Sequence, residues 1–380
     1  MKFVAKTLFG LEKVLADELA TLGAEDITPA NRAVLFSGDM HLLYKVNYMS
    51  RTALSVLMPI QEFWIKSADD LYKKCMQIRW DQYMDVDNTF SVAPVVQSPL
   101  FNHTGYAGLK LKDAVADYFR NINGRRPSVN PENPDILINL HISNEKVTVS
   151  LDSSSIPLFK RGYRQEQAAA PLNEVLAAGM LLMSGWNATT DLIDPMCGSG
   201  TIPIEAGLMA SNIPAGKFRK YFGFQNWKGY DPGIFNIIVE EGEAGIKKSP
   251  VKIFGFDISE LAVSQAAKNV ASAGLKADIF IDMVDFKSLK APSVEGVILI
   301  NPPYGERLLP EETDSLYNMI GTSLKHNFHG YTAWIISSNK ESLKHIGLKP
   351  KEKHILYNGS LECSFIKYEL YQGSKKVGQG

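Results

Sequence analysis

The sequence predicts an α/β protein in which a smaller α+β region precedes a mostly parallel sheet. Short apolar runs such as 252–256 and 296–300 alternate with helical patterns, which is typical of parallel strands connected by helices. A strand, a glycine-rich loop and a helix follow one another within 191–206. Two strand patterns flank Asn358 and Gly359, and Asn-Gly is a strong hairpin signal. We therefore expect the sheet to end in an antiparallel hairpin.

Length and charge limit the domain organisation and the kinds of partner. A chain of 380 residues exceeds what one hydrophobic core usually supports. We expect three domains, at residues 1–53, 54–156 and 157–380. The 40 basic and 41 acidic residues give a net charge of -1, which argues against binding nucleic acid through overall charge. Any contact with nucleic acid must come from local basic patches.

The cysteine pattern and the N-terminal segment indicate a soluble, unexported protein. Cys75, Cys197 and Cys363 lie far apart and form no C-x-x-C pair, so we expect neither a disulfide framework nor a zinc site. Residues 1–20 mix charged with apolar side chains, and no apolar run is long enough to span a bilayer. These features predict a cytoplasmic location, no membrane partner and no bound metal.

Residues 1–156 alternate between strand and helix patterns. The expected order is a strand at 1–7, a helix at 10–22, a strand at 27–37, a helix at 41–50, segments at 54–60 and 63–65 without an assigned type, a helix at 68–78 and a strand at 89–96. A basic amphipathic helix then extends to Arg120, a loop covers 121–134, and a hairpin at 135–142 and 146–151 closes the region.

The basic helix and the residues after it could contact nucleic acid. Lys110, Lys112 and Arg120 lie on this helix, and Arg125 and Arg126 follow it. Such side chains suit contacts with phosphates, although a solvated helix face has the same composition. Both interpretations remain open at this point.

A second basic segment is the connector 157–164, which reads P-L-F-K-R-G-Y-R. Lys160, Arg161 and Arg164 surround Tyr163, and aromatic and cationic side chains together suit base stacking and phosphate contact. A junction that only docks two domains would have a similar composition. A helix expected at 168–183 then leads to the glycine-rich loop.

The glycine-rich loop reads D-L-I-D-P-M-C-G-S-G-T-I-P-I-E-A at 191–206. Gly198 and Gly200 allow a sharp turn and close approach of a ligand, and the helix that follows offers unpaired N–H groups. The loop lacks the G-K-[ST] of a triphosphate-binding loop, and Pro203 replaces the third glycine of a dinucleotide fingerprint. A smaller polar or anionic ligand is favoured, with an ordinary tight turn as the alternative.

Three further apolar runs end in polar side chains. Asp257 follows the first run and suits a ribose diol, whereas Asp285 and Phe286 follow the second and could take an adenine amino group and its face. The third run ends in N-P-P-Y at 301–304. Because ligands bind outside the carboxyl ends of strands in open α/β sheets, we expect these segments to meet.

Together these segments resemble the class I S-adenosylmethionine-dependent methyltransferases, which have a Rossmann-like sheet. N-P-P-Y resembles the subset that methylates exocyclic amino groups of bases. The loop 102–108 followed by L-K-L-K-D-A resembles the THUMP domain, an RNA-binding module, here preceded by a ferredoxin-like α+β region. N-G-S-L-E-C at 358–363 is similar to the terminal hairpin of the THUMP-linked family. The long insertion between Met209 and Val251 also resembles one in this family and either covers the active site or packs on a sheet.

The resemblance implies S-adenosylmethionine as the cofactor and assigns roles to residues. The implied cofactor-binding residues are Asp194, Pro195, Cys197, Gly198, Ser199, Gly200, Thr201, Asp257, Ile258, Asp285, Phe286 and Asn301. The implied catalytic residues are Asn301, Pro302, Pro303 and Tyr304. In the family the Asn oxygen and the first proline carbonyl accept the amino hydrogens, and the aromatic ring stacks on the base. Because these acceptors orient the delocalised lone pair of the amine, neither a metal nor a covalent nucleophile is required.

The leading interpretation is an RNA methyltransferase acting on guanine N2, similar to bacterial 23S rRNA enzymes. A tRNA guanine-N2 enzyme and an adenine-N6 nucleic-acid enzyme are the alternatives, since N-P-P-Y serves both amines. A non-catalytic RNA-binding ribosome-assembly factor is disfavoured by the intact Asp257, Asp285 and Asn301. A nicotinamide dehydrogenase is disfavoured by Pro203, and a covalent pyrimidine mechanism by Cys197, which sits in the cofactor loop. RNA is the expected partner, and the oligomeric state stays open.

Overall fold

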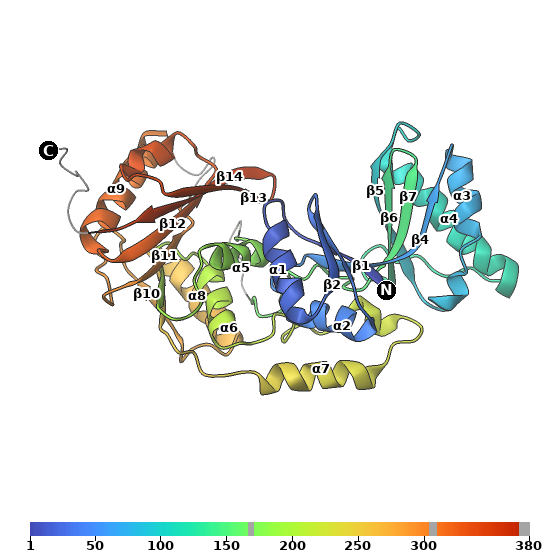
Figure 1. Cartoon of the computed structure of the whole chain (residues 1–380), viewed down its shortest axis with the longest axis horizontal. Helices are drawn as coiled ribbons and strands as arrows, with labels where there is room; N and C mark the ends of the chain where they lie inside the picture. Colours follow the sequence, from blue (N-terminus) through green and yellow to red (C-terminus); the bar gives the residue numbers. More distant parts are fainter. Residues whose placement is uncertain (166–170, 304–309, 372–380) are drawn as a thin grey trace. The chain divides into compact units, whose positions relative to one another are not determined.

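The computed structural model describes residues 1–165, 171–303 and 310–371 (Figure 1). The chain divides into two compact units. The first comprises Met1–Thr7, Leu15–Lys160 and Arg219–Glu241, and the second comprises Leu8–Val14, Arg161–Phe218 and Gly242–Gly380. Within the described ranges, no helix combines the length and apolarity needed to cross a membrane.

The first unit is built on one continuous seven-stranded sheet with the order β2-β3-β1-β4-β7-β6-β5. Its strands are β1 (Lys2–Lys6), β2 (Glu25–Ala30), β3 (Ala33–Ser37), β4 (Ser55–Trp64), β5 (Phe90–Gln97), β6 (Ile136–Ser143) and β7 (Lys146–Asp152). The helices of this part of the chain are α1 (Glu12–Leu22), α2 (Met40–Met49), α3 (Ala68–Met76) and α4 (Thr104–Asn123). All neighbouring strands are antiparallel except β5 and β6. The ferredoxin-like strands therefore share a sheet with the strands that follow them.

One strand prediction in this unit was wrong. Residues 27–37 are two antiparallel strands, β2 and β3, rather than one. The turn between them includes Arg32 at φ 54, a left-handed backbone at a non-glycine residue, so no glycine marks it in the sequence. The segments at 54–60 and 63–65, which had no assigned type, contribute to the single strand β4, whose register against β7 shifts between Pro59 and Gln61.

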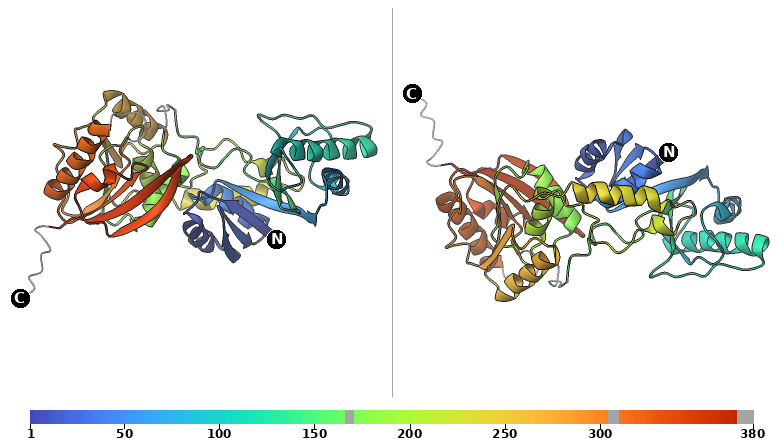
Figure 2. Two further views of the ribbon diagram at one scale, coloured as in Figure 1. Left: turned by 90° about the horizontal axis from the view of Figure 1, so that it is seen from above. Right: turned by 90° about the horizontal axis from the view of Figure 1, so that it is seen from below.

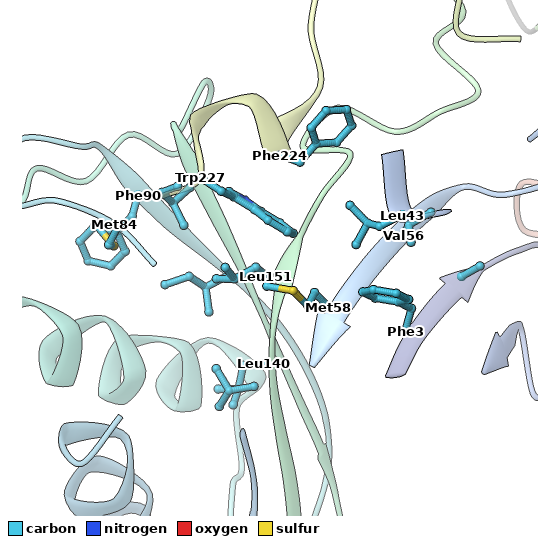
Figure 3. Close-up of a cluster of buried hydrophobic side chains, with 14 of the residues drawn as sticks. Phe3, Leu43, Val56, Met58, Met84, Phe90, Leu140, Leu151, Phe224 and Trp227 are labelled. Carbon is cyan, nitrogen blue, oxygen red and sulfur yellow. The ribbon is translucent and has the colours of Figure 1, made fainter. Parts of the chain in front are cut away.

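The insertion packs on the first sheet over residues 219–241. Phe224 and Trp227 are buried in the same core as Met58 and Leu151 (Figure 3). The Phe224 ring stacks on Tyr44 with 4.3 Å between ring centroids. Helix α7 (Pro232–Ala244) continues this segment. Of the two interpretations of the insertion, packing on a sheet is the one that the structure supports for these residues.

The second unit is built on a seven-stranded sheet with the order β10-β9-β8-β11-β12-β14-β13. Its strands are β8 (Asp191–Asp194), β9 (Ile253–Asp257), β10 (Ile279–Met283), β11 (Gly296–Ile300), β12 (Tyr331–Ser337), β13 (Glu352–Asn358) and β14 (Leu361–Glu369). Its helices are α5 (Glu174–Met183), α6 (Thr201–Ala210), α8 (Glu260–Ser272) and α9 (Pro310–Asn327). Strands β8 to β12 are parallel, and β14 is antiparallel to both β12 and β13. The predicted parallel sheet with a terminal hairpin is thus confirmed.

Helices cover both faces of the second sheet (Figure 2). Ile298 and Ile300 of β11 share a core with Tyr317 and Ile320 of α9. Because side chains alternate along a strand, Leu299 between them points to the opposite face. Helices α5, α6 and α8 lie on that face (Figure 1). Because β9 lies on one side of β8 and β11 on the other, the strand order reverses at β8, which is the place where such sheets bind ligands.

The helix expected at 168–183 begins later, at Glu174. Its N-cap is Asn173, whose Oδ1 accepts hydrogen bonds from the backbone N–H groups of Val175 at 2.9 Å and Leu176 at 3.3 Å. Residues 168–170 lie outside the described residues.

Candidate active site

A cavity of about 780 Å³ opens at the carboxyl ends of β8, β9 and β11. All the predicted cofactor-binding residues except Gly200 line it, namely Asp194, Pro195, Cys197, Gly198, Ser199, Thr201, Asp257, Ile258, Asp285, Phe286 and Asn301. Pro302 and Pro303 also line the cavity, and Tyr304 lies outside the described residues. The fold therefore brings together side chains that are more than 100 residues apart in sequence.

Hydrogen bonds to β9 fix the glycine-rich loop. The backbone of Gly198 (φ 53) donates to Oδ2 of Asp257 at 2.9 Å, and the Cys197 N–H donates to the Phe256 carbonyl at 2.8 Å. The other oxygen of Asp257 accepts from the Ser259 N–H at 2.9 Å. Gly200, at φ 84, is the N-cap of α6. Positive φ at both positions explains the two glycines in the loop.

Burial controls the ionisation of two groups at this loop. It raises the pKa of Asp194 well above its ordinary value, and repulsion from Asp257 adds to the rise. Burial also raises the pKa of the Cys197 thiol well above its ordinary value. Since a thiol nucleophile reacts as the thiolate, these surroundings agree with Cys197 as a packing residue.

Asn301 presents an unpaired acceptor. Its Oδ1 atom is buried and has no hydrogen-bond partner among the described residues, and the side chain lines the cavity directly after β11. Leaving a buried acceptor unsatisfied is costly, so native proteins rarely do so without a ligand or function. The position is therefore suited to a donor that arrives with a ligand.

Arg164 holds the glycine-rich loop in place through side-chain hydrogen bonds. Its guanidinium donates to Ser199 Oγ and Thr201 Oγ1, both at 2.9 Å, and to Glu174 Oε1 at 2.7 and 3.0 Å. Asn269 of α8 adds a bond from Nδ2 to the Ser199 carbonyl at 3.0 Å. Burial raises the pKa of Glu174, and Arg164 offsets part of this rise. Arg164, predicted to bind RNA, instead connects α5 with the N-terminus of α6.

Arg161 was also predicted to contact RNA, but the structure buries its side chain. Its side chain is 1% exposed and forms an ion pair with Glu205 of α6, with 3.2 Å between Nη2 and Oε2. Tyr163 is also buried, and its hydroxyl donates to Glu205 Oε1 at 3.2 Å. Because Glu205 holds both side chains inside the unit, neither is presented to RNA. Lys160 is exposed.

The basic residues at α4 lie on the surface, and each has a carboxylate partner. The ion pairs are Lys110–Asp69 at 2.9 Å, Lys112–Asp113 at 3.2 Å, Arg120–Asp117 at 3.3 Å, Arg125–Asp87 at 3.1 Å and Arg126–Asp117 at 2.5 Å. Surface ion pairs of this kind contribute little to stability. These cations can therefore exchange partners, and RNA binding by them stays a prediction.

The sequence did not mark part of the cavity lining. Leu316 and Met319 come from α9, and Asn358 and Leu361 flank the turn of the β13–β14 hairpin. The sequence predicts only a turn role for Asn358. Its position beside Asn301 in one cavity depends on the pairing of β14 with β12, which no local pattern reveals.

Three family models match the chain. Residues 161–367 match the model described as RMKL-like, methyltransferase domain, residues 66–152 match the THUMP domain, and residues 2–57 match the RlmL ferredoxin-like domain. The first of these covers more than half of the 380 residues.

Similar proteins carry related descriptions. A protein of Synechocystis sp. named as an RNA methyltransferase is 38% identical over 97% of this chain and 97% of its own. The ribosomal RNA large subunit methyltransferase K/L of Syntrophotalea carbinolica is 38% identical over 97% of this chain, which spans only 54% of that protein. The crystal structure of SMU.472, described as a methyltransferase in complex with SAH, matches with a TM-score of 0.88 and 28% identity, covering 98% of this chain and 99% of that one.

Proposed function

From the premise that the chain belongs to the RMKL-like methyltransferase family and carries a THUMP domain, we propose that it transfers a methyl group from S-adenosylmethionine to guanine N2 in 23S rRNA. Methyl transfer and the cofactor follow from the family. The chain spans about half the length of the K/L relatives, so the RNA and the base belong to the proposal.

The cavity suits the proposed cofactor. Its volume lies in the range of small-molecule sites, about 300–1,000 Å³. Asp257 would accept the ribose hydroxyls, and Asp285 and Phe286 would take the adenine amino group and ring. We assign Asp194 to the ammonium group, because a cation would favour ionisation of this buried carboxyl. When bound, S-adenosylmethionine supplies an electrophilic methyl group.

The observation that carries the proposal is the unsatisfied Oδ1 of Asn301. An exocyclic amino group offers two hydrogens, and Asn301 Oδ1 and the Pro302 carbonyl would accept one each. With both hydrogens held, the lone pair of the nitrogen turns out of conjugation and toward the methyl donor. The two prolines fix φ in this segment, which keeps the acceptors in place before the base arrives. The amino nitrogen would accept the methyl group as the bond from that group to the sulfonium sulfur breaks and SAH leaves, and one hydrogen of the nitrogen would pass to water as a proton.

The RNA part of the proposal rests on the THUMP match at 66–152 and on the partly exposed cations Lys110 and Lys112 of α4. A base inside a helix cannot reach a cavity of this kind, so the target must be unpaired or flipped out.

The test is methyl transfer from tritiated S-adenosylmethionine into total rRNA and tRNA from a strain that lacks the gene, followed by nucleoside analysis. The proposal expects label in N2-methylguanosine of large-subunit rRNA. Label in N2-methylguanosine of tRNA would move the substrate to tRNA, and label in N6-methyladenosine would replace guanine by adenine. No label in either pool, despite binding of SAH, would overturn the proposal for free RNA and favour an assembly intermediate or a non-catalytic role.

A point variant tests the acceptor. Asn301→Ala should lower the methylation rate by roughly 10²–10³-fold, as loss of a transition-state hydrogen-bond partner does elsewhere. The affinity for SAH should change little. Asn318→Ala, on an exposed turn of α9, is the control and should change neither quantity. An equal loss of rate and of SAH affinity would mean that Asn301 has a structural role.

A further inference from the structure

The hairpin between β13 and β14 contributes Asn358 and Leu361 to the lining of the cavity. The two residues form the last cross-strand pair before the turn. Because the members of such a pair lie on the same face of a hairpin, one face carries both side chains toward the cavity. Asn358 is half-buried, and Leu361 is 45% exposed. A carboxamide and an apolar side chain thus lie next to each other at this end of the cavity.

The turn does not require an asparagine at position 358. Asn-Gly is favoured where both central residues of a two-residue turn have positive φ. Asn358 still pairs with Leu361, so the central residues here are Gly359 and Ser360. Gly359 has φ 64, whereas the described residues with positive φ do not include Asn358. The backbone of β13 would accept many residue types at this position, so the turn does not explain the carboxamide.

The order of the strands separates the hairpin from the residues assigned to the cofactor. Asp285 follows β10, Asp257 ends β9 and Asp194 ends β8, which are three neighbouring strands at one side of the sheet. Asn301 follows β11, the next strand, and the hairpin strand β14 lies beyond β12. A base whose amino group is held at Asn301, with the methyl donor on the β8 side, would therefore extend toward the hairpin.

Asn358 is also the polar lining residue without a role in binding the cofactor or the amino group. The other polar side chains among the described lining residues come from the glycine-rich loop and from the ends of β8, β9, β10 and β11, namely Asp194, Ser199, Thr201, Asp257, Asp285 and Asn301. Ligand sites usually place a few polar groups in a mostly apolar wall, where they fix the orientation of the ligand. Asn358 is suited to that task at the hairpin end of the cavity.

We propose that Asn358 recognises the target base as guanine through the N1–H and O6 positions beside the amino group, while Leu361 packs on the face of the base. The inference rests on the proposed function, because it concerns the base whose amino group Asn301 holds. A carboxamide has both an acceptor and donor hydrogens. Its Oδ1 would accept from N1–H of guanine, and its Nδ2 would donate to O6.

The same carboxamide would fit adenine less well. Adenine held by its N6 amino group has acceptors at N1 and N7 and no further N–H on that edge. The Nδ2 of Asn358 could donate to N1, but Oδ1 would find no donor on the base. A site that holds polar groups for a partner discriminates strongly against an analogue that leaves them unpaired. Asn358 is therefore a specificity-determining residue, whereas contact of Leu361 with the face of the base favours no particular base.

The test compares three 12-nucleotide RNAs that consist of uridines with one variable base in the middle. The variable base is guanine, 2-aminopurine or adenine. 2-Aminopurine keeps the amino group at position 2 but has neither N1–H nor O6. Fluorescence anisotropy of a 5′-labelled RNA measures binding to the full chain saturated with SAH. Because the rest of the RNA is identical, its contacts cancel in the ratio of two affinities.

The unaltered chain should bind the guanine RNA roughly five- to hundred-fold more tightly than the 2-aminopurine RNA, as expected for a bidentate contact with a base edge. Asn358→Ala should abolish this preference by lowering the affinity for the guanine RNA alone. Asn358→Leu keeps the approximate volume of the side chain but removes both polar groups, so it should give the same result. Either Asn358 variant with the preference of the unaltered chain would overturn the proposal, as would an unaltered chain that does not distinguish the two RNAs.

Two variants of the same hairpin serve as controls. Leu361→Ala should weaken binding of the guanine and 2-aminopurine RNAs by the same factor, roughly two- to ten-fold, because it removes apolar contact area only. A loss of the preference in Leu361→Ala alone would overturn the assignment to Asn358. Ser360→Ala, at an exposed position of the same turn, should change neither affinity. The affinity for SAH should stay unchanged in all four variants, which shows that the fold and the cofactor site are intact.

The two proposals fail in distinguishable ways. Methyl transfer by the unaltered chain into N2 of guanine decides the proposed function. If this transfer occurs but the Asn358 variants keep the preference for guanine, only the recognition by Asn358 is overturned. If transfer goes to another base or does not occur, while the preference for guanine exists and is lost in the Asn358 variants, the recognition stands and the assigned reaction falls.

Discussion

The connector 157–164 and α4 both carry basic residues that the sequence predicts to bind RNA, but these residues differ in burial. Arg161 and Arg164 are 1% and 10% exposed, and their partners Glu205 and Glu174 are buried as well. Arg120 at α4 is 54% exposed and pairs with Asp117, which is 19% exposed. A cluster of basic residues in the sequence therefore does not reveal its role. The burial of the cations and of their carboxylate partners decides whether the charge stabilises the fold or can contact a ligand.

The largest effect is expected from breaking the buried pair. Arg161→Ala leaves Glu205 without its ion-pair partner inside the unit and should lower the free energy of unfolding by about 3–5 kcal/mol. Urea denaturation measures this change, with Arg120→Ala as the exposed control at about 0–1 kcal/mol. The double variant Arg161→Met with Glu205→Leu should recover much of the loss. A cost for Arg161→Ala as small as that of the control would contradict the structural role.

Arg164 should act on the cofactor rather than on RNA. Arg164→Ala removes the donors to Ser199 and Thr201 and should weaken SAH binding by about ten- to hundred-fold, given about 1.5–3 kcal/mol for a charged hydrogen bond. Isothermal titration with SAH measures this change. Arg120→Ala should leave it untouched. If Arg164→Ala reduced RNA affinity and spared SAH affinity, the original assignment to RNA would be restored.

A buried acid offers a smaller effect that depends on pH. The folded-state pKa of Asp194 is raised, so the folded chain binds this proton more tightly and loses stability as pH rises above the ordinary value near 3.9 through the raised value. Asp194→Asn should therefore stabilise the ligand-free protein more at pH 8 than at pH 5, while weakening SAH binding. Thermal unfolding at both pH values measures the difference. A gain that is independent of pH would refute the role of ionisation.

The catalytic unit could be predicted from the sequence because its chemistry is local. The loop around Gly198, the acid that ends β9 and the hairpin at Gly359 each carry a short signal, and the sheet topology brings them together. Arg161 could not be placed, because its burial depends on Glu205, which lies 44 positions further along the chain.

The packing of the insertion could not be predicted from the sequence for a related reason. Helix α7 was not expected, although Asp231 precedes it and Pro232 begins it, which are ordinary start signals. Its buried side chains, such as Phe235, contact the core of the first unit, which lies far away in sequence. Periodicity can reveal such a helix, but it does not identify the surface on which the helix packs.

The smallest effect is expected at α4, whose cations are more exposed than those of the connector. Replacing Lys110 and Lys112 by Gln should weaken RNA binding by roughly two- to ten-fold and lower the salt slope by about 0.7–0.9 for each lost phosphate contact. Asp69→Asn removes the counterion of Lys110 without removing the cation, so it should leave affinity equal or slightly higher. Filter binding of rRNA between 50 and 200 mM salt measures both quantities. An unchanged slope in the double variant would mean that these lysines face solvent only, and a loss of affinity in Asp69→Asn would mean that the ion pair shapes the helix rather than competing with RNA.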